Sequence, residues 1–341
     1  MKKLLLTALA AVFSSVSVFA LNPEDFSLTV EPVFGVKNGT LGEYVFLKQS
    51  NYDDDLLSYL DWEIKNEIYA GFKAAGGYRN IFASITLKTA FSQSGGIMTD
   101  SDWFNNIPSG VSGGVADFTS CSNYKTCYSE SDNYIDSDFT FEIKSGYTFR
   151  PTEVFTILPY ISYEYSDIKM SGKNGWGKYG DAGYGSYGYY FPWNNNSDLT
   201  NRSEDFTGKK VISYERAKNI FWLGSDFHLN LPQNIFLNLG AQFSPYIYVL
   251  SIDQHHLTYT DYADETPGYF SAFRFSADTG ITIKKSHTLS LGFSYFYMQK
   301  LRGTNYSKSS SKSTYSKDTI VEGGADEYYW EIYLSYKYKI F

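Results

Sequence analysis

Two pairs of ionisable residues in this sequence share one spacing. Asp100 and Asp102 are separated by a single residue, and so are Asp253 and His255. Because side chains at positions i and i+2 of a β-strand point to the same side, each pair would present both groups on one face. Two such pairs that face each other could hold a water molecule between a carboxylate and an imidazole. The four residues are therefore candidates for hydrolytic chemistry.

Each pair also has a simpler interpretation. The two aspartates follow a Gly-Gly pair and could belong to a solvated loop tip, or to a loop that binds calcium weakly. His256 stands beside His255 and could be the histidine that matters. The same-face argument selects His255, because only this histidine is two residues from Asp253.

The residues that must position these groups alternate between apolar and polar side chains, which predicts β-strands. The alternation is clearest in residues 80–92, 137–149 and 327–341. An apolar face toward lipid and a polar face toward a lumen is the pattern of a membrane β-barrel. Several runs exceed the roughly 5–6 residues of an ordinary strand. Ten segments are expected, and they begin near Phe26, Leu56, Asn80, Tyr134, Phe155, Val211, Ile235, Tyr269, His287 and Glu327.

An even number of strands suits a closed single-chain bacterial barrel, and closure leaves no sheet edge in lipid. Short turns, such as residues 150–152 and 231–233, alternate with long polar loops, the longest expected over residues 169–210. The sequence therefore predicts an all-β fold, a closed ten-stranded antiparallel transmembrane β-barrel with long extracellular loops.

Composition and the first residues agree with this class. The 341 residues include 32 Tyr, 26 Phe and 6 Trp, and aromatic girdles are typical of outer-membrane barrels. Residues 1–20 have the basic start, apolar run and small-residue cleavage site of a signal peptide, so residues 21–341 are expected to form a single barrel domain. The net charge of −8 argues against nucleic acid as a partner.

Cys121 and Cys127 are the two cysteines of the chain. A structural zinc site would need four ligands, and no histidine is close to them in sequence. An oxidising compartment favours a small loop disulfide instead. No metal and no cofactor is expected.

One predicted strand conflicts with simple alternation. Counting back from Asp253 in steps of two reaches Phe243, Leu239 and Leu237, which belong to the expected lipid face. Either a β-bulge near Pro245 resets the alternation, or the strand has left the membrane before it reaches Asp253.

Four stretches, in order along the chain, resemble motifs of the omptin family of outer-membrane endopeptidases. They are Leu56–Gly71 with its Leu-Asp-Trp, Met98–Trp103 with Asp-x-Asp-Trp, Tyr214–Gly224, and Ser251–His256 with Asp-x-His. The resemblance implies an aspartic endopeptidase of the bacterial outer membrane whose active site faces the exterior. Its partners would be protein or peptide substrates and outer-membrane lipids.

The resemblance also implies a role for each candidate residue. His255 would be the general base, and Asp253 would orient it and stabilise its charged form. Asp100 would help polarise the attacking water, with Asp102 in support. Water would attack the peptide carbonyl directly.

Substrate preference is where the chain departs from the family. Omptins cleave near basic residues because acidic groups line the pocket for the residue before the scissile bond. Glu43 matches one of these groups, but Ser251 stands where the second is expected. The resemblance therefore implies a weaker preference for basic residues. The alternative is an omptin-like barrel without protease activity that acts as an adhesin or a porin-like protein.

Overall fold

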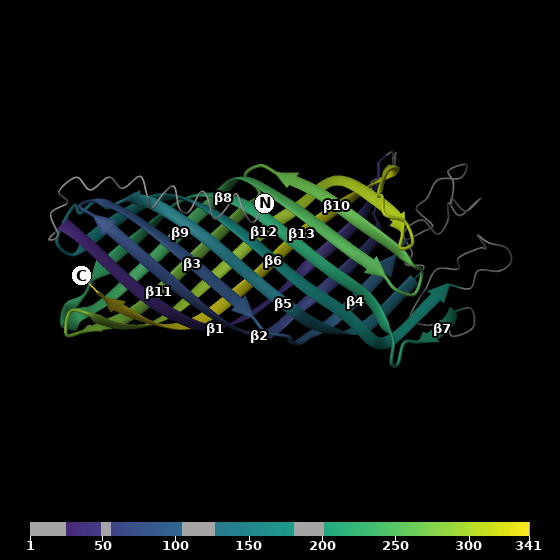
Figure 1. Ribbon diagram of the computed structural model, residues 1–341, viewed down its shortest axis with the longest axis horizontal. Helices are drawn as coiled ribbons and strands as arrows, with labels where there is room; N and C mark the ends of the chain where they lie inside the picture. The colour runs from purple at the N-terminus through teal and green to yellow at the C-terminus, as the bar shows by residue number, and fades with distance from the viewer. Residues whose placement is uncertain (1–24, 49–55, 104–126, 181–200, 341) are drawn as a thin grey trace.

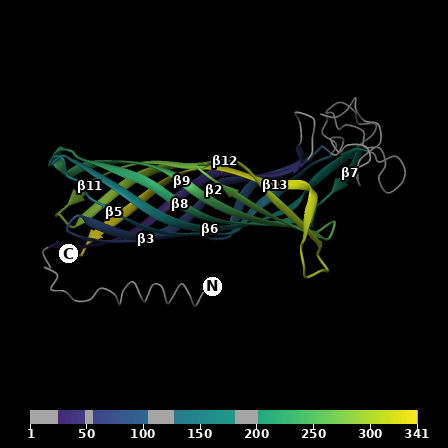
Figure 2. The same cartoon turned by 90° about the horizontal axis from the view of Figure 1, so that it is seen from above.

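The computed structural model describes residues 25–48, 56–103, 127–180 and 201–340. These residues form an elongated antiparallel β-barrel (Figures 1 and 2). The described part of the chain contains no helix with the length and hydropathy needed to cross a bilayer. The predicted signal peptide, residues 1–20, lies outside the described residues. The strands are β1 (Phe26–Leu47), β2 (Leu56–Tyr78), β3 (Ile81–Ala90), β4 (Gln93–Asp102), β5 (Cys127–Tyr147), β6 (Phe155–Gly180), β7 (Asn201–Asp205), β8 (Lys210–Asn230), β9 (Ile235–His255), β10 (Thr260–Gly268), β11 (Ala272–Ile283), β12 (His287–Ser309) and β13 (Ser316–Lys339).

Thirteen strands fill ten positions of the ring in the described part of the chain. β3 and β4 share the third position, because both pair with β2 and β5. β10 and β11 share the eighth, because both pair with β9 and β12. β7 pairs with the last residues of β6 and extends beyond the ring. β13 pairs with β1 and closes the barrel, so the predicted ten-stranded barrel is confirmed.

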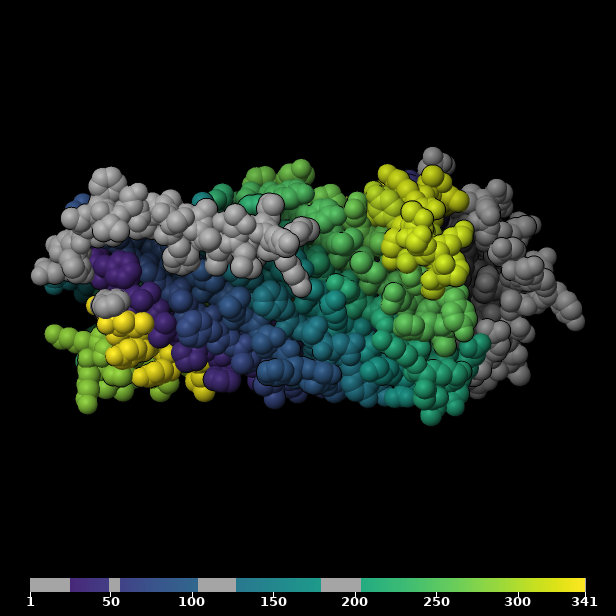
Figure 3. Space-filling model, viewed as in Figure 1, coloured from purple at the N-terminus to yellow at the C-terminus, as the bar shows by residue number. Residues whose placement is uncertain are grey.

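The outer face carries an apolar belt of exposed side chains, which includes Phe34, Ile68, Leu239 and Leu334. Aromatic rings border the belt on the side nearer to β7, where the rings of Tyr246 and Tyr269 lie 5.3 Å apart. Such belts with aromatic borders face lipid in outer-membrane barrels. Several strands continue past this border toward β7, and the β12–β13 hairpin projects at the same end (Figures 2 and 3). We call it the β7 end.

Two predicted strand starts were too late. β5 and β13 begin at Cys127 and Ser316, well before the expected starts near Tyr134 and Glu327. The segment expected near Tyr269 corresponds to β11, which begins at Ala272, and β10 before it was not expected. The expected loop over residues 169–210 also contains the end of β6 and all of β7. Alternation between apolar and polar side chains reports a lipid face and a lumen face. Past the belt both faces of a strand are polar. The sequence therefore stops alternating there, although the strand continues to form backbone hydrogen bonds with its neighbours.

A β-bulge in β9 resolves the conflict in alternation. Phe221 of β8 pairs with Tyr246 of β9, and Leu223 pairs with Phe243. Ser244 and Pro245 therefore oppose a single residue of β8, and the alternation of β9 changes phase there. Proline has no backbone N–H to donate to the ladder, which suits a bulge. The predicted bulge near Pro245 is confirmed, and it turns the later part of β9 so that Asp253 is buried inside the barrel.

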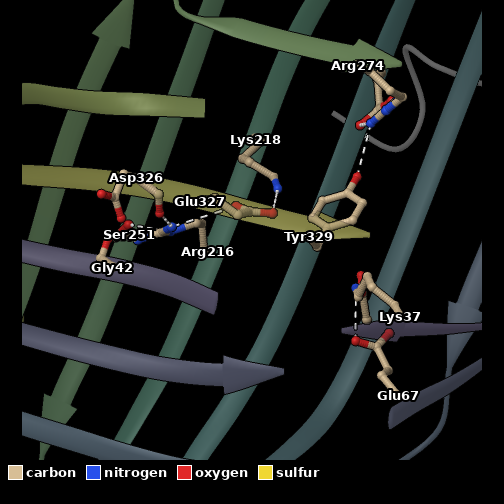
Figure 4. Close-up of polar contacts among 12 residues, drawn as sticks. Lys37, Gly42, Glu67, Arg216, Lys218, Ser251, Arg274, Asp326, Glu327 and Tyr329 are labelled. Carbon is tan, nitrogen blue, oxygen red and sulfur yellow. Dashed lines mark hydrogen bonds and ion pairs between the residues drawn. The ribbon is translucent and has the colours of Figure 1, made fainter. Parts of the chain in front are cut away.

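Ion pairs and aromatic rings cross the lumen near its middle (Figure 4). Arg274 of β11 donates two hydrogen bonds to Glu164 of β6, 2.6 and 2.9 Å long. Lys218 of β8 pairs with Glu327 of β13. Both glutamates are buried. A cavity of about 600 Å³ lies between this layer and the turns at the end away from β7.

The predicted disulfide between Cys121 and Cys127 stays a prediction. Cys127 is buried at the start of β5, but Cys121 lies outside the described residues. We expect an alkylating reagent to modify neither thiol of the unfolded, unreduced protein and both thiols after reduction, as read by mass. Alkylation of both thiols before reduction would show that the bond is absent.

Candidate active site

The site lies inside the barrel at the β7 end, past the apolar belt. β4 ends with Asp100 and Asp102, and β9 ends with Asp253 and His255. The two strands occupy different parts of the ring, since β4 pairs with β2 and β5 whereas β9 pairs with β8 and β10. Strand pairing around the ring, rather than closeness in sequence, therefore brings the two pairs to one end of the barrel.

Asp253 holds the imidazole of His255. The two residues share the inner face of β9, and Nε2 of His255 lies 2.8 Å from Oδ2 of Asp253. The ring edge of Tyr262, from the neighbouring β10, packs against the imidazole with ring centroids 5.2 Å apart. The carboxylate is buried and the imidazole is three-quarters buried. This contact fixes the orientation of the ring and leaves Nδ1 as the nitrogen that can take a proton from water.

The aspartates raise the pKa of His255 to about 9. Burial of the imidazole lowers its pKa, but the charge and the hydrogen bond of Asp253 outweigh burial. The charges of Asp100 and Asp102 raise the pKa further. The charges of the aspartates on β4 therefore reach the imidazole on β9.

His256 has different surroundings. Its Nε2 lies 2.7 Å from Oγ of Ser213 on β8, and its backbone N–H donates to the carbonyl oxygen of Val211. Partial burial and the nearby charge of Lys210 lower the pKa of His256. The structure places His255, not His256, beside Asp253, in agreement with the same-face argument.

Glu43 joins the same cluster from β1. Its side chain is only 4% exposed. Burial raises the pKa of Glu43 well above its usual range, and the charges of Asp253, Asp264 and Asp100 act in the same direction. Like charges that share a buried site hold protons in this way. Glu43 thus lies near both predicted catalytic pairs.

Ser251 is buried beside an arginine that sequence reasoning missed. Arg216 of β8 is fully buried, and its Nε donates to the hydroxyl oxygen of Tyr214 at 2.7 Å and to that of Ser251 at 3.4 Å. Nη1 donates to the carbonyl oxygen of Asp326, and Nη2 to that of Gly42 (Figure 4). Arg216 lies in Tyr214–Gly224, a stretch that resembles the family, so the sequence could have drawn attention to it. Its burial could not be predicted, because it depends on strands that are far apart in sequence.

Asp264 is a second residue that sequence reasoning missed. It is 2% exposed and lies on β10, directly opposite Ser251 in the β9–β10 ladder. No sequence signal pointed to it, because the eighth strand was expected to begin only near Tyr269.

Comparison with known proteins agrees with this architecture. The Omptin family model matches residues 23–340. The crystal structure of the outer membrane protease OmpT from Escherichia coli is similar, with a TM-score of 0.74 and 14% identity, over 95% of this chain and 99% of that chain. The outer membrane protein OprG from Pseudomonas aeruginosa gives a TM-score of 0.35 at 6% identity, over 93% of this chain and 96% of that chain. No curated protein matches this sequence.

Proposed function

Since this chain belongs to the omptin family, we propose that it is an endopeptidase of the bacterial outer membrane that hydrolyses peptide bonds near basic residues. The observation that carries the proposal is the hydrogen-bonded pair of Asp253 and His255, with the charges of Asp100 and Asp102 acting on the same imidazole. This arrangement provides a general base and carboxylates for a water molecule.

The proposed reaction begins with water between His255 and the carboxylates of β4. Neutral His255 takes a proton through Nδ1 as the water oxygen attacks the peptide carbonyl carbon. Asp253, 2.8 Å from Nε2, stabilises the imidazolium that forms. The imidazolium then gives its proton to the leaving amine nitrogen as the carbon–nitrogen bond breaks. Asp100 orients the water, and Asp102 supports Asp100.

The position of the site supports a role outside the cell. The four catalytic candidates lie past the apolar belt, at the end of the barrel that the sequence assigns to the exterior. Peptides or exposed segments of other proteins would be the substrates, and outer-membrane lipids would surround the belt. We propose residues 21–341 as one barrel domain that remains after signal-peptide removal.

A peptide with two adjacent basic residues and a fluorogenic reporter tests the proposal. Refolded protein in detergent should cleave it at one bond, identified by mass. A matched peptide with two glutamines should be cleaved more slowly, because it lacks the charge that the acidic cluster attracts. Folded protein that cleaves neither peptide would contradict the proposed activity.

The raised pKa of His255 predicts the pH dependence of this activity. Only the neutral imidazole can accept a proton, so kcat/KM should increase as pH increases through about 9. Asp253→Asn removes the charge that favours the imidazolium, so the pKa of His255 should decrease. The rate of this variant, although smaller, should therefore reach half of its own maximum at a lower pH. The same midpoint in both proteins would assign the titration to another group.

A porin-like role predicts a different result. Ion pairs such as Arg274–Glu164 and Lys218–Glu327 cross the lumen together with buried aromatic rings (Figure 4). Barrels of this size are narrow enough for side chains to fill them. We expect no stable conductance when the purified protein is inserted into a planar bilayer. A steady ohmic conductance would favour the porin alternative.

A further inference from the structure

Asp264 brings a carboxylate to the place where Ser251 has none. The two residues face each other in the β9–β10 ladder, so both side chains point into the barrel. Directly opposite residues of an antiparallel pair have Cβ atoms about 4.5–5.5 Å apart. A carboxylate on Asp264 can therefore reach the space that a carboxylate at position 251 would serve.

The surroundings of Asp264 direct its carboxylate toward β13. Asn305 of β12 donates a 2.8 Å hydrogen bond from Nδ2 to Oδ1 of Asp264. Oδ1 also lies against Gly323 of β13, where a Cβ atom would be only 2.0 Å away. Glycine at this position leaves room for the carboxylate. The side chain thus extends from β10 past β12 to β13, which is the neighbour of β1 in the barrel.

Glu43 lies on β1 and faces the same space. The charges of Asp253 and Asp264 both act on Glu43, and the charge of Asp253 acts on Asp264. Among the described residues nothing donates a hydrogen bond to Oε2 of Glu43, although this atom is buried. Burial and the charge of Asp253 raise the pKa of Asp264 to about 7, while Asn305 and Arg216 lower it. Two buried, mutually repelling carboxylates with an unused acceptor favour a cation between them.

Arg216 does not fill this role itself. Its hydrogen bonds go to oxygen atoms of Tyr214, Ser251, Gly42 and Asp326 that carry no formal charge, and its ion pair, 3.7 Å long, is with Glu327. In Figure 4 its guanidinium lies among Gly42, Ser251 and Asp326. The charge of Arg216 acts on Glu43 and Asp264, but its N–H groups are directed to other oxygen atoms, which leaves both carboxylates able to pair directly with a cation of the substrate.

We propose that Glu43 and Asp264 together bind the cationic side chain of the substrate residue before the scissile bond, with Asp264 in place of the carboxylate that Ser251 lacks. This inference rests on the proposed function, since it assigns the cation to a peptide substrate. Asp264 faces Ser251, which lies two residues before Asp253 on the inner face of β9, so one side chain can span from the attacked carbonyl to this pocket. The expected preference for basic residues is then strong rather than weakened.

The test compares two peptides that differ at one residue, arginine or its neutral isostere citrulline, before the cleaved bond. Asp264→Asn should lower the arginine-over-citrulline ratio of kcat/KM by about tenfold or more, because a charge-assisted hydrogen bond is lost. Cleavage of the citrulline peptide should change little. Assays above pH 7 keep Asp264 ionised. Asp264→Ser serves as the second variant if Asp264→Asn does not fold.

Two further variants separate a specificity role from a structural one. The double variant Ser251→Asp with Asp264→Ser moves the carboxylate from β10 to the opposite position on β9. It should restore most of the arginine preference that Asp264→Ser loses. Glu265→Gln should leave the ratio unchanged, because Glu265 is the next residue of β10 and points to the other face. An unchanged ratio in both Asp264 variants, or equal losses in Glu265→Gln, would overturn the inference.

Binding distinguishes this inference from the proposed function. The dissociation constants of both peptides are measured on His255→Ala and on His255→Ala with Asp264→Asn. If His255→Ala binds the arginine peptide more tightly than the citrulline peptide, and Asp264→Asn removes this difference, the pocket is supported. This conclusion holds even if the protein cleaves neither peptide and the proposed activity is wrong. Equal binding of the two peptides by His255→Ala, or a preference that persists without Asp264, overturns the pocket whatever the turnover shows.

Discussion

Replacing His255 by alanine should lower kcat for a dibasic peptide by about 10²–10⁴-fold, the range typical for loss of a general base. The imidazole is held 2.8 Å from Asp253, inside the barrel and under the influence of the aspartates of β4. Without it, water has no group positioned to accept its proton. Steady-state kinetics of the refolded variant, with circular dichroism to verify its strand content, measures the effect.

His256→Ala is the matched control for this variant. His256 is adjacent in sequence, but it contacts Ser213 and lies on the other face of the strand end. We expect its kcat to stay within a small factor of the wild-type value. If His256→Ala is the inactive variant and His255→Ala is active, the assignment of the general base is wrong by one residue. Full activity in both variants would exclude a histidine base.

Replacing Arg274 by leucine should lower the free energy of unfolding by about 3–5 kcal/mol, the cost of removing one partner of a buried ion pair. Arg274 donates two hydrogen bonds to Glu164, whose side chain is 3% exposed. The variant leaves this carboxylate without its charged partner in the middle of the lumen. Urea unfolding in detergent, followed by tryptophan fluorescence, measures the change.

Two further variants check that the loss comes from an uncompensated buried charge. Adding Glu164→Leu to Arg274→Leu should recover most of the stability, because the unpaired carboxylate is then absent. Lys169→Leu breaks the exposed pair of Lys169 and Glu215, which are 3.1 Å apart, and should cost less than about 1 kcal/mol. Equal losses from the exposed and the buried pair would contradict the explanation.

The sequence by itself was sufficient for the barrel and for the four catalytic candidates. Alternation along single strands determines which side chains face lipid, and a closed barrel in which all neighbouring strands are antiparallel needs an even number of strands. The spacing of Asp253 and His255 places both on one face of one strand, whatever that strand pairs with. These properties depend only on residues that are close in sequence, so they can be predicted without the tertiary structure.

Sequence reasoning was less complete where a strand leaves the lipid or changes phase. The early parts of β5 and β13, and the whole of β10, have no alternation to detect, because past the belt both faces are polar. The bulge at Ser244 and Pro245 was one of two interpretations that the sequence allowed. Choosing between them required the register of β9 against β8.

Only the tertiary structure decided what lies around the reacting groups. Asp264 faces Ser251 because of the register between β9 and β10, and it contacts Gly323 because of the order of β10, β12 and β13 in the ring. The burial of Arg216 likewise depends on carbonyl oxygens of strands at the two ends of the chain. The sequence shows where the acidic residues are, but it does not show which residues lie next to them in the folded barrel. Closing the barrel brings residues from β1 and β10 together, and that juxtaposition determines which carboxylates share a site.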